Sequence, residues 1–138
     1  MTRKEQREKI LQLLYAWEYN RDDLKEIDQL KYPFNSKKLT AFMQRMIDGI
    51  IINEAFLDEK INLYAINWNA EKMFMLDKLI LRLAIFEMFF IKETPKKVII
   101  NEAIELAKKY SAENSKTIIN GILNQIFYSE MGGKNEEN

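Results

Sequence analysis

Residues 98–121 read VIINEAIELAKKYSAENSKTIING, and this stretch determines the fold class of the chain. Apolar side chains within it and just beyond it recur every three or four positions, which is the spacing of one face of an α-helix. They form two stripes, one at Ile99, Ala103, Leu106, Ala107 and Tyr110 and one at Ile119, Ile122, Leu123, Ile126 and Phe127. The stretch therefore predicts two amphipathic helices, the second capped at Asn114-Ser115.

The same helical spacing continues through the upstream part of the chain. Three further stripes lie at Ile10, Leu13, Leu14 and Trp17, at Leu39, Phe42, Met43, Met46, Ile47 and Ile50, and at Leu76, Leu79, Ile80 and Leu83. The alternation of apolar and polar residues that half-buried strands show is missing. The pattern predicts an all-α bundle of six or seven helices with short loops.

The most apolar run of the chain extends from Leu79 to Ile91. It contains Arg82 and Glu87, and it is far shorter than the ~20 residues that a membrane span needs. The run is therefore typical of a buried central helix. No membrane association is expected.

Turn chemistry marks the expected helix boundaries. The segment KYPFNS at 31–36 contains Pro33 and ends in Ser36, a good N-cap for the second helix. Asn69 is expected to cap a short helix near 70–74. Thr94 is predicted as an N-cap, with Pro95 at the first helical position.

The length of 138 residues suits one domain. We expect a single helical domain over residues 1–131, divided at the break near 67–75 into an N-terminal half (about 1–68) and a C-terminal half (about 69–131). The two halves are expected to share one core. The small polar residues GGKNEEN at 132–138 predict a flexible tail.

Composition excludes several kinds of chemistry. The chain has no Cys and no His, so disulfides, thiolate and imidazole metal sites and the usual catalytic triads are impossible. No glycine-rich phosphate loop is present. Glu102 and Glu105 lie on one helix face, but an ion pair from Glu105 to Lys109 explains them better than a metal does. The chain is expected to lack enzymatic activity, metals and cofactors.

The N-terminal residues are polar and mixed in charge, and no apolar segment of a secretory signal follows them, so a cytoplasmic location is expected. The net charge is zero, so RNA binding would need a local patch. One candidate patch precedes the first stripe and consists of Arg3, Lys4, Arg7 and Lys9, opposed by Glu5 and Glu8. These cations suit RNA phosphates, although a solvated helix start has the same composition.

Gly121 interrupts the last helical stripe. Glycine within a helix costs about 1 kcal/mol relative to alanine. Close packing against a neighbouring helix is the expected reason for its presence.

The stretch at 98–121 closely resembles the NusB family of bacterial transcription antitermination factors. The specific elements are INEAIELAK, then any residue and an aromatic residue, and, two to five residues later, SK, three residues and NG. LLYAWE at 13–18 is similar to the first helix of that family, and Asp77-Lys78 with Leu81-Arg82-Leu83-Ala84 and Glu87 is similar to its central helix. The resemblance is collinear over about residues 3–127.

This resemblance implies a NusB-like bundle of about seven helices in two subdomains. It implies binding of boxA RNA in leader transcripts, mainly of ribosomal RNA operons, together with NusE, which is also a small-subunit ribosomal protein. The pair on boxA would join a complex that keeps RNA polymerase from terminating. Neither enzymatic activity nor a cofactor is implied.

The resemblance also suggests site residues. The implied RNA-binding residues are Arg3, Lys4 and Arg7 in the first helix and Asn114, Ser115, Lys116 and Ile118 around the start of the last. Asp77 and Lys78 would lie near the NusE-binding face.

The sequence departs from the family pattern at several positions. Glu5 and Gln6 dilute the basic start, Asn114 replaces a common Asp, and Ile118 replaces a common aromatic residue. The diluted charge predicts weak binding of boxA by this protein alone, with NusE supplying much of the affinity.

Three other interpretations stay open. NusB-like domains precede some ribosomal RNA methyltransferases, but no methyl-donor loop follows here, so a stand-alone role is expected. A pure protein-interaction bundle, including a homodimer, fits the zero net charge. The third interpretation is an enzyme that uses Glu102. Turnover that survives purification and is lost in Glu102→Gln would indicate it.

Overall fold

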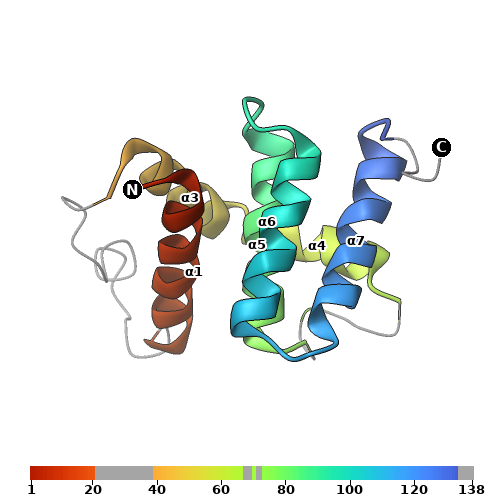
Figure 1. Ribbon diagram of the computed structural model, residues 1–138, viewed down its shortest axis with the longest axis horizontal. Helices are drawn as coiled ribbons and strands as arrows, with labels where there is room; N and C mark the ends of the chain where they lie inside the picture. Colours follow the sequence, from red (N-terminus) through yellow and green to blue (C-terminus); the bar gives the residue numbers. More distant parts are fainter. Residues whose placement is uncertain (21–38, 67–69, 71–72, 134–138) are drawn as a thin grey trace. The chain divides into compact units, whose positions relative to one another are not determined.

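The regular structure of the chain is helical throughout the part described by the computed structural model, which covers residues 1–20, 39–66, 70 and 73–133. Its helices, labelled as in Figure 1, are α1 (Arg3–Asn20), α3 (Ala41–Ile52), α4 (Glu54–Tyr64), α5 (Met75–Phe90), α6 (Lys96–Tyr110) and α7 (Ser115–Glu130). No strand occurs among these residues. The all-α prediction is confirmed, and six described helices agree closely with the expected number of about seven.

The chain forms two compact units, Met1–Asn53 and Glu54–Asn138. The first contains α1 and α3, and the second contains α4 to α7. The expected halves with a boundary near 68, and the expectation that they share one core, stay predictions.

In the first unit, α1 packs against α3. The apolar stripes predicted for both helices supply the buried side chains, among them Ile10 and Leu14 from α1 and Met43 and Met46 from α3. Helix α3 begins at a side-chain cap, because the Thr40 hydroxyl accepts a hydrogen bond from the Met43 N–H at 3.1 Å. The predicted cap at Ser36 lies outside the described residues, as does the one at Asn69.

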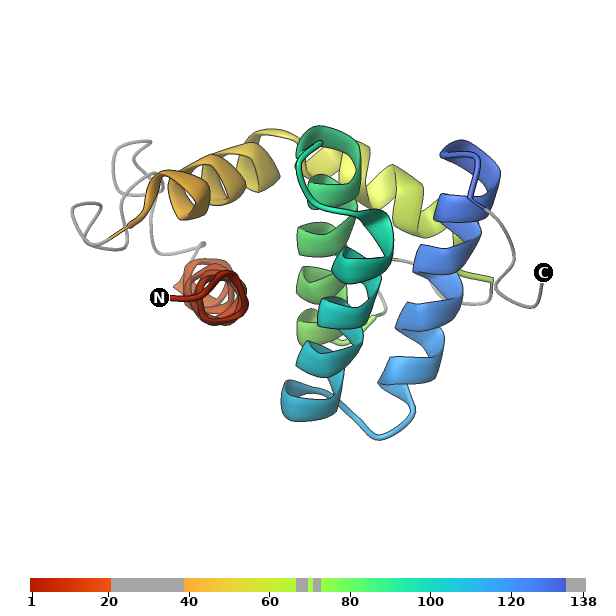
Figure 2. The same ribbon diagram turned by 45° about the horizontal axis from the view of Figure 1, so that its top comes forward.

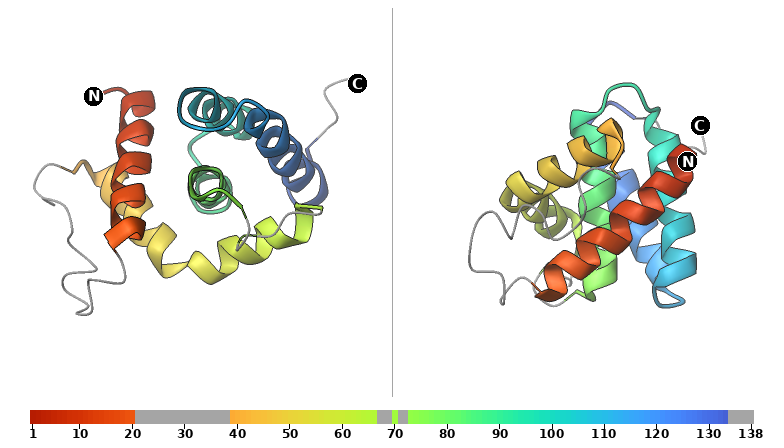
Figure 3. Two further views of the ribbon diagram at one scale, coloured as in Figure 1. Left: turned by 90° about the horizontal axis from the view of Figure 1, so that it is seen from below. Right: turned by 90° about the vertical axis from the view of Figure 1, so that its left-hand side faces the viewer.

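In the second unit, α6 packs against both α5 and α7. Figure 2 shows these three helices side by side, and the left panel of Figure 3 shows α4 running across them. Every residue of α5 from Leu79 to Met88 is buried, which confirms the predicted central helix.

A buried ion pair connects α4 to α5. Arg82 is 3% exposed, and its Nε and Nη2 donate to the two carboxylate oxygens of Asp58 at 2.7 and 2.8 Å. Its Nη2 also lies 3.5 Å from Glu54 Oε1. This two-bond geometry gives a buried arginine the hydrogen bonds it needs among apolar side chains.

Two helix ends differ from the expectation or refine it. Pro95 is the N-cap of α6 and not its first residue, because its ψ of 139° is non-helical and its carbonyl accepts from the N–H groups of Val98 and Ile99. After α7, Gly132 adopts a left-handed φ of 69°, which turns the Gly133 N–H back onto the Phe127 carbonyl at 2.9 Å.

None of the helices in the described ranges has the length and apolarity that crossing a membrane requires.

Candidate functional site

The start of α1 is built on a capping box. The Thr2 hydroxyl accepts from the Glu5 N–H at 3.1 Å, and the Glu5 carboxylate accepts from the Thr2 N–H at 3.0 Å. The hydrogen bond from the Thr2 backbone is the main reason why the pKa of Glu5 is lowered. Glu5, which dilutes the basic cluster in the sequence, therefore has a structural role in starting the helix.

Arg3 and Lys4 are exposed on the first turn of α1. The Arg3 guanidinium carbon lies 3.8 Å from the centre of the Phe42 ring of α3, a cation–π contact that restricts the long side chain. Lys4 makes no ion pair or hydrogen bond through its side chain with the residues that the structure describes. Both cations are accessible to a phosphate.

Arg7 differs from them, because its side chain is only 4% exposed. Its guanidinium carbon lies 5.8 Å from the Phe42 ring centre. Gln6 is also buried, donating to the Met1 carbonyl and accepting from the Thr40 hydroxyl at 2.5 Å. RNA contact by Arg7 stays a prediction, but its burial favours a packing role and leaves Arg3 and Lys4 as the accessible cations of the predicted set.

The second predicted segment lies at the turn from α6 to α7. Ala112, Glu113 and Asn114 are exposed, and Lys116 is exposed on the first turn of α7. Asn114 is the N-cap of α7 by position, yet its side chain makes no capping bond. The amide of Asn114 and the ammonium of Lys116 therefore both face solvent.

Ser115 and Asp77, predicted for RNA and for a partner protein respectively, are buried and bind each other. The Ser115 hydroxyl donates to Asp77 Oδ2 at 3.0 Å, and the Ser111 hydroxyl donates to Asp77 Oδ1. Lys78, the neighbour of Asp77, is half-buried. Contact of Asp77 and Lys78 with a partner stays a prediction, but the Asp77 carboxylate is directed into its own unit.

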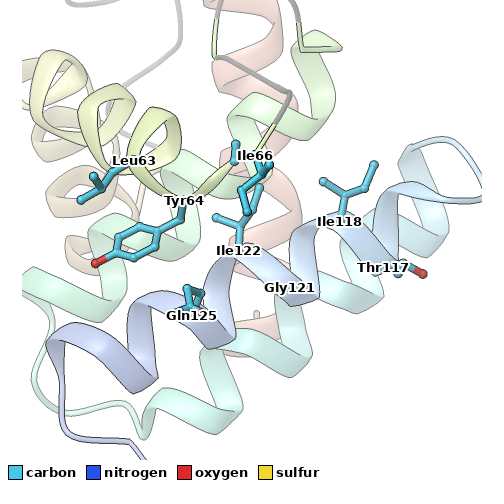
Figure 4. Close-up of a pocket in the computed structure, with 9 residues that line it drawn as sticks. Leu63, Tyr64, Ile66, Thr117, Ile118, Gly121, Ile122 and Gln125 are labelled. Carbon is cyan, nitrogen blue, oxygen red and sulfur yellow. The ribbon is translucent and has the colours of Figure 1, made fainter.

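Ile118 borders an open hollow of about 590 Å³ between the end of α4 and α7. Figure 4 shows Ile118, Gly121, Ile122 and Gln125 on α7 facing Leu63, Tyr64 and Ile66. Leu63 and Ile66 are 64% and 84% exposed, so the rim is apolar and accessible. Such a hollow suits a flat apolar group more than a charged one.

The expected packing role of Gly121 is wrong. Gly121 is exposed, and a Cβ built on it would meet no atom within 4 Å. It lies on the side of α7 that borders the hollow, whereas the buried side chains of Ile119 and Ile126 lie on another side. The absent side chain keeps the hollow open.

Replacing Gly121 by Ala should raise the free energy of unfolding by about 0.5–1 kcal/mol, because the helix gains propensity without a steric cost. Urea-induced unfolding measures the effect. Gly133→Ala is the matched control and should destabilise, since its Cβ would lie 2.6 Å from the Phe127 ring. Destabilisation by Gly121→Ala would show that the position is in fact tightly packed.

A polar contact connects α4 to the end of α7 beside the hollow. The Glu130 carboxylate accepts from Lys60 Nζ and from the Tyr64 hydroxyl, each at 2.5 Å. The hydrogen bond from Lys60 is the main reason why the pKa of Glu130 is lowered, and the one from Tyr64 adds to it. The same hydrogen bond to Glu130 raises the pKa of Tyr64. The contact therefore orients the Tyr64 ring that lines the hollow.

This contact should stabilise the fold most strongly at intermediate pH. The contribution of Glu130 is present above its ordinary pKa of 4.5 and is lost as the pH falls through its lowered folded-state pKa. The contribution of Tyr64 is present below its ordinary pKa of 10.0 and is lost as the pH rises through its raised folded-state pKa.

Stability measured against pH should show both losses in the wild type. Glu130→Gln should lose the alkaline step and keep only a smaller acid step, to which Glu5 contributes through its lowered pKa. Glu105→Gln is the control, since exposed Lys108 is the one ion-pair partner of Glu105 among the residues that the structure describes. If Glu130→Gln followed the wild-type curve at both ends, this explanation of the pH dependence would fail.

The paired glutamates of α6 show no metal site. Glu105 lies 3.2 Å from Lys108, one position before the expected Lys109. Within the described ranges, no group of three or more Asp and Glu side chains is placed to hold a metal ion.

Three contributors to these surfaces were not predicted, namely Phe42 under Arg3, Ser111 at Asp77 and Tyr64 in the hollow. The Thr2-x-x-Glu5 capping box was also missed, although its spacing is visible in the sequence. The other three depend on contacts between distant segments, which a single sequence does not show.

Comparison with known proteins identifies the family. The NusB family model matches residues 4–127, which is nearly the whole chain. The chain belongs to the NusB family. That match includes the α6–α7 turn, the hollow and α1 from Lys4 onward, whereas Thr2 and Arg3 just precede it and Glu130 follows it.

Similar NusB proteins cover the chain over nearly its full length. The transcription antitermination protein NusB of Elusimicrobium minutum is 42% identical over 94% of this chain and 95% of its own. That of Thermodesulfovibrio yellowstonii is 36% identical over 95% of both. Transcription antitermination is therefore the function that family membership gives to this chain.

Solved structures agree on the fold. NusB from T. maritima has a TM-score of 0.81 at 32% identity and covers 94% of this chain and 92% of its own. A chain in a crystal structure described as a plectonemic RNA supercoil has a TM-score of 0.77 over 96% of this chain and 98% of its own. At 20% identity, that second likeness shows the fold alone.

Proposed function

We propose that this NusB-family protein binds boxA-type leader RNA together with NusE, and so helps RNA polymerase to avoid termination, mainly in ribosomal RNA operons. The observation that carries the proposal is the location of the accessible cations. Arg3, Lys4 and Lys116 are exposed in the two segments that resemble the RNA surface of the family. Phosphate neutralisation by such cations supplies affinity without a net positive charge on the whole protein.

Sequence preference would come from the uncharged groups beside these cations. Asn114 presents an amide that can both donate to and accept from a base edge. The hollow next to Ile118 offers apolar and aromatic surface to an unstacked base, although Ile118 itself provides no stacking ring. This arrangement supports recognition of single-stranded RNA more than recognition of a duplex.

The small number of accessible cations supports a partner requirement. With Arg7 buried, fewer phosphates can be neutralised on α1 than the sequence suggests. We therefore expect weak binding by the protein alone and tighter binding with NusE present. No catalytic step is part of this function, and a cytoplasmic location follows from its place in transcription.

The test is binding of a labelled boxA-type RNA at two salt concentrations, with and without NusE, against an RNA of scrambled sequence. We expect salt-sensitive binding that NusE strengthens and that scrambling weakens. Equal affinity with and without NusE would refute the partner requirement. No binding with NusE present would refute the RNA role and favour a protein-only adaptor, whose apolar association would respond little to salt.

A further inference from the structure

A buried carboxylate lies beneath the turn that joins α6 to α7. Asp77 is 1% exposed, and its two oxygens accept separate hydrogen bonds from Ser111 and Ser115. Ser111 is the C-cap of α6 and Ser115 is the first residue of α7. The two hydroxyl oxygens are 3.1 Å apart. One side chain of α5 thus holds both ends of the turn, which contains only Ala112, Glu113 and Asn114.

The location of this carboxylate has a cost that an apolar side chain would avoid. A buried carboxylate is unfavourable unless hydrogen bonds satisfy it. Within the described residues, Asp77 forms no ion pair, and the two serines are its side-chain partners. Its position in the first turn of α5 and next to the start of α7 adds favourable helix dipoles. The benefit that best explains such a residue is a defined geometry.

The hydrogen bonds from Ser111 and Ser115 to Asp77 form a tie between α5 and the α6–α7 turn. The residues on either side of Ser115 belong to the proposed RNA surface. Asn114 directly precedes Ser115, and Lys116 directly follows it. Both are exposed, whereas Ser115 is 1% exposed. A rotation of Ser115 would therefore move both functional side chains together.

We infer that Asp77 is a positioning residue, which through Ser111 and Ser115 keeps the α6–α7 turn in the one arrangement that presents Asn114 and Lys116 to RNA. This inference rests on the proposed function. It replaces direct contact with a partner protein as the role of Asp77. Ordering the turn in advance spares RNA binding the entropy cost of ordering it.

Two variants test the inference on the full chain. Ser111→Ala removes one hydroxyl at the end of α6, and Asp77→Asn keeps the shape of the side chain but not both acceptors. Ser111→Thr keeps the hydroxyl and should behave as the wild type. Ser129→Ala is the control for hydrogen exchange, because it removes a hydroxyl that accepts a hydrogen bond within α7, from Gln125 at 2.8 Å, far from the turn.

Two measurements are made on folded protein, well below the unfolding temperature. Amide hydrogen exchange at Ser115 and Ile118, whose N–H groups bond to Ala112 and Asn114, should become about tenfold faster in Ser111→Ala and Asp77→Asn. The affinity for boxA-type RNA in the absence of NusE should fall about fivefold in the same variants. Ser111→Thr should match the wild type in both measurements, and Ser129→Ala should match it in hydrogen exchange.

The outcomes separate the inference from the proposed function. Unchanged exchange in both variants overturns the tie, and faster exchange with unchanged RNA affinity overturns the positioning role. If Asp77→Asn weakens only the binding of NusE, the role of Asp77 is direct contact with the partner protein, and the positioning role is overturned. If the wild type binds no boxA-type RNA even with NusE present, the proposed function fails and with it the role in RNA presentation, while exchange still decides whether Asp77 holds the turn.

Discussion

Replacing Asp58 by Ala should lower the free energy of unfolding by about 3 kcal/mol, the lower end of the range for breaking a buried ion pair. Arg82 is the more deeply buried partner, so the change removes two short hydrogen bonds from a charge that water reaches poorly. Glu54, at 3.5 Å, replaces only part of that interaction. Urea-induced unfolding followed by circular dichroism measures the loss.

Glu54→Ala provides the control for this prediction. Glu54 reaches the same guanidinium from the same helix, but at a longer distance, and should cost about 1 kcal/mol or less. The double variant Asp58→Leu with Arg82→Met should lose less stability than Asp58→Ala, since it removes both charges of the pair. Equal losses for Asp58→Ala and Glu54→Ala would contradict the assignment of Asp58 as the main partner.

The double variant Arg3→Gln with Lys4→Gln should bind boxA-type RNA about 30-fold more weakly, equivalent to about 2 kcal/mol for two charged contacts. Its plot of log affinity against log salt should be less steep by about 1.4, because each neutralised phosphate of a single strand contributes about 0.7. Glutamine keeps the aliphatic stem and a good helix propensity, and the Thr2–Glu5 capping box is untouched.

The control for this variant removes the same number of positive charges from a different part of the surface. Lys92→Gln with Lys96→Gln removes two cations near the start of α6, at the opposite end of that helix from the α6–α7 turn. It should leave both the affinity and the salt dependence close to the wild type. An equal loss in both double variants would mean that overall charge, and not the start of α1, governs RNA binding.

Much of the fold could be predicted from the sequence because helical periodicity reports burial directly. The stripe at Ile99, Ala103 and Leu106 is buried as expected, and so is the central run from Leu79 to Met88. Helix ends were harder, since the role of Pro95 depends on one ψ angle. The expectations at Ser36 and Asn69 concern residues outside the described part of the chain.

The candidate site is harder to predict than the fold. A charged side chain suggests contact with solvent or RNA, whereas the apolar stripe on which it lies indicates burial. Arg7 lies three, four and seven positions before Ile10, Leu11 and Leu14, so the apolar stripe already placed it on the buried face. Asp77 has the same spacing to Ile80, Leu81 and Ala84. A charged residue on a buried stripe predicts packing or hydrogen bonding and not an exposed contact.

Gly121 shows what periodicity alone cannot supply. Gly121 lies within α7, where the sequence alone suggests a packed surface. The structure shows that it faces the hollow beside the end of α4. Contacts between α4 and α7 link segments more than 50 residues apart, as the bond from Tyr64 to Glu130 illustrates. Such pairs leave no trace in the local pattern of one sequence.

The most direct measurement is a titration of isotope-labelled protein with boxA-type RNA, followed by backbone amide chemical shifts in nuclear magnetic resonance. The proposed surface predicts that the largest changes fall at residues 2–7 and 112–121, with smaller ones at 63–66 along the hollow. The Lys60 ammonium also lies 5.5 Å from the Phe56 ring centre and 5.4 Å from the Phe89 ring centre. Changes concentrated instead around this aromatic cluster, with residues 2–7 and 112–121 unaffected, would contradict the RNA surface proposed for this protein.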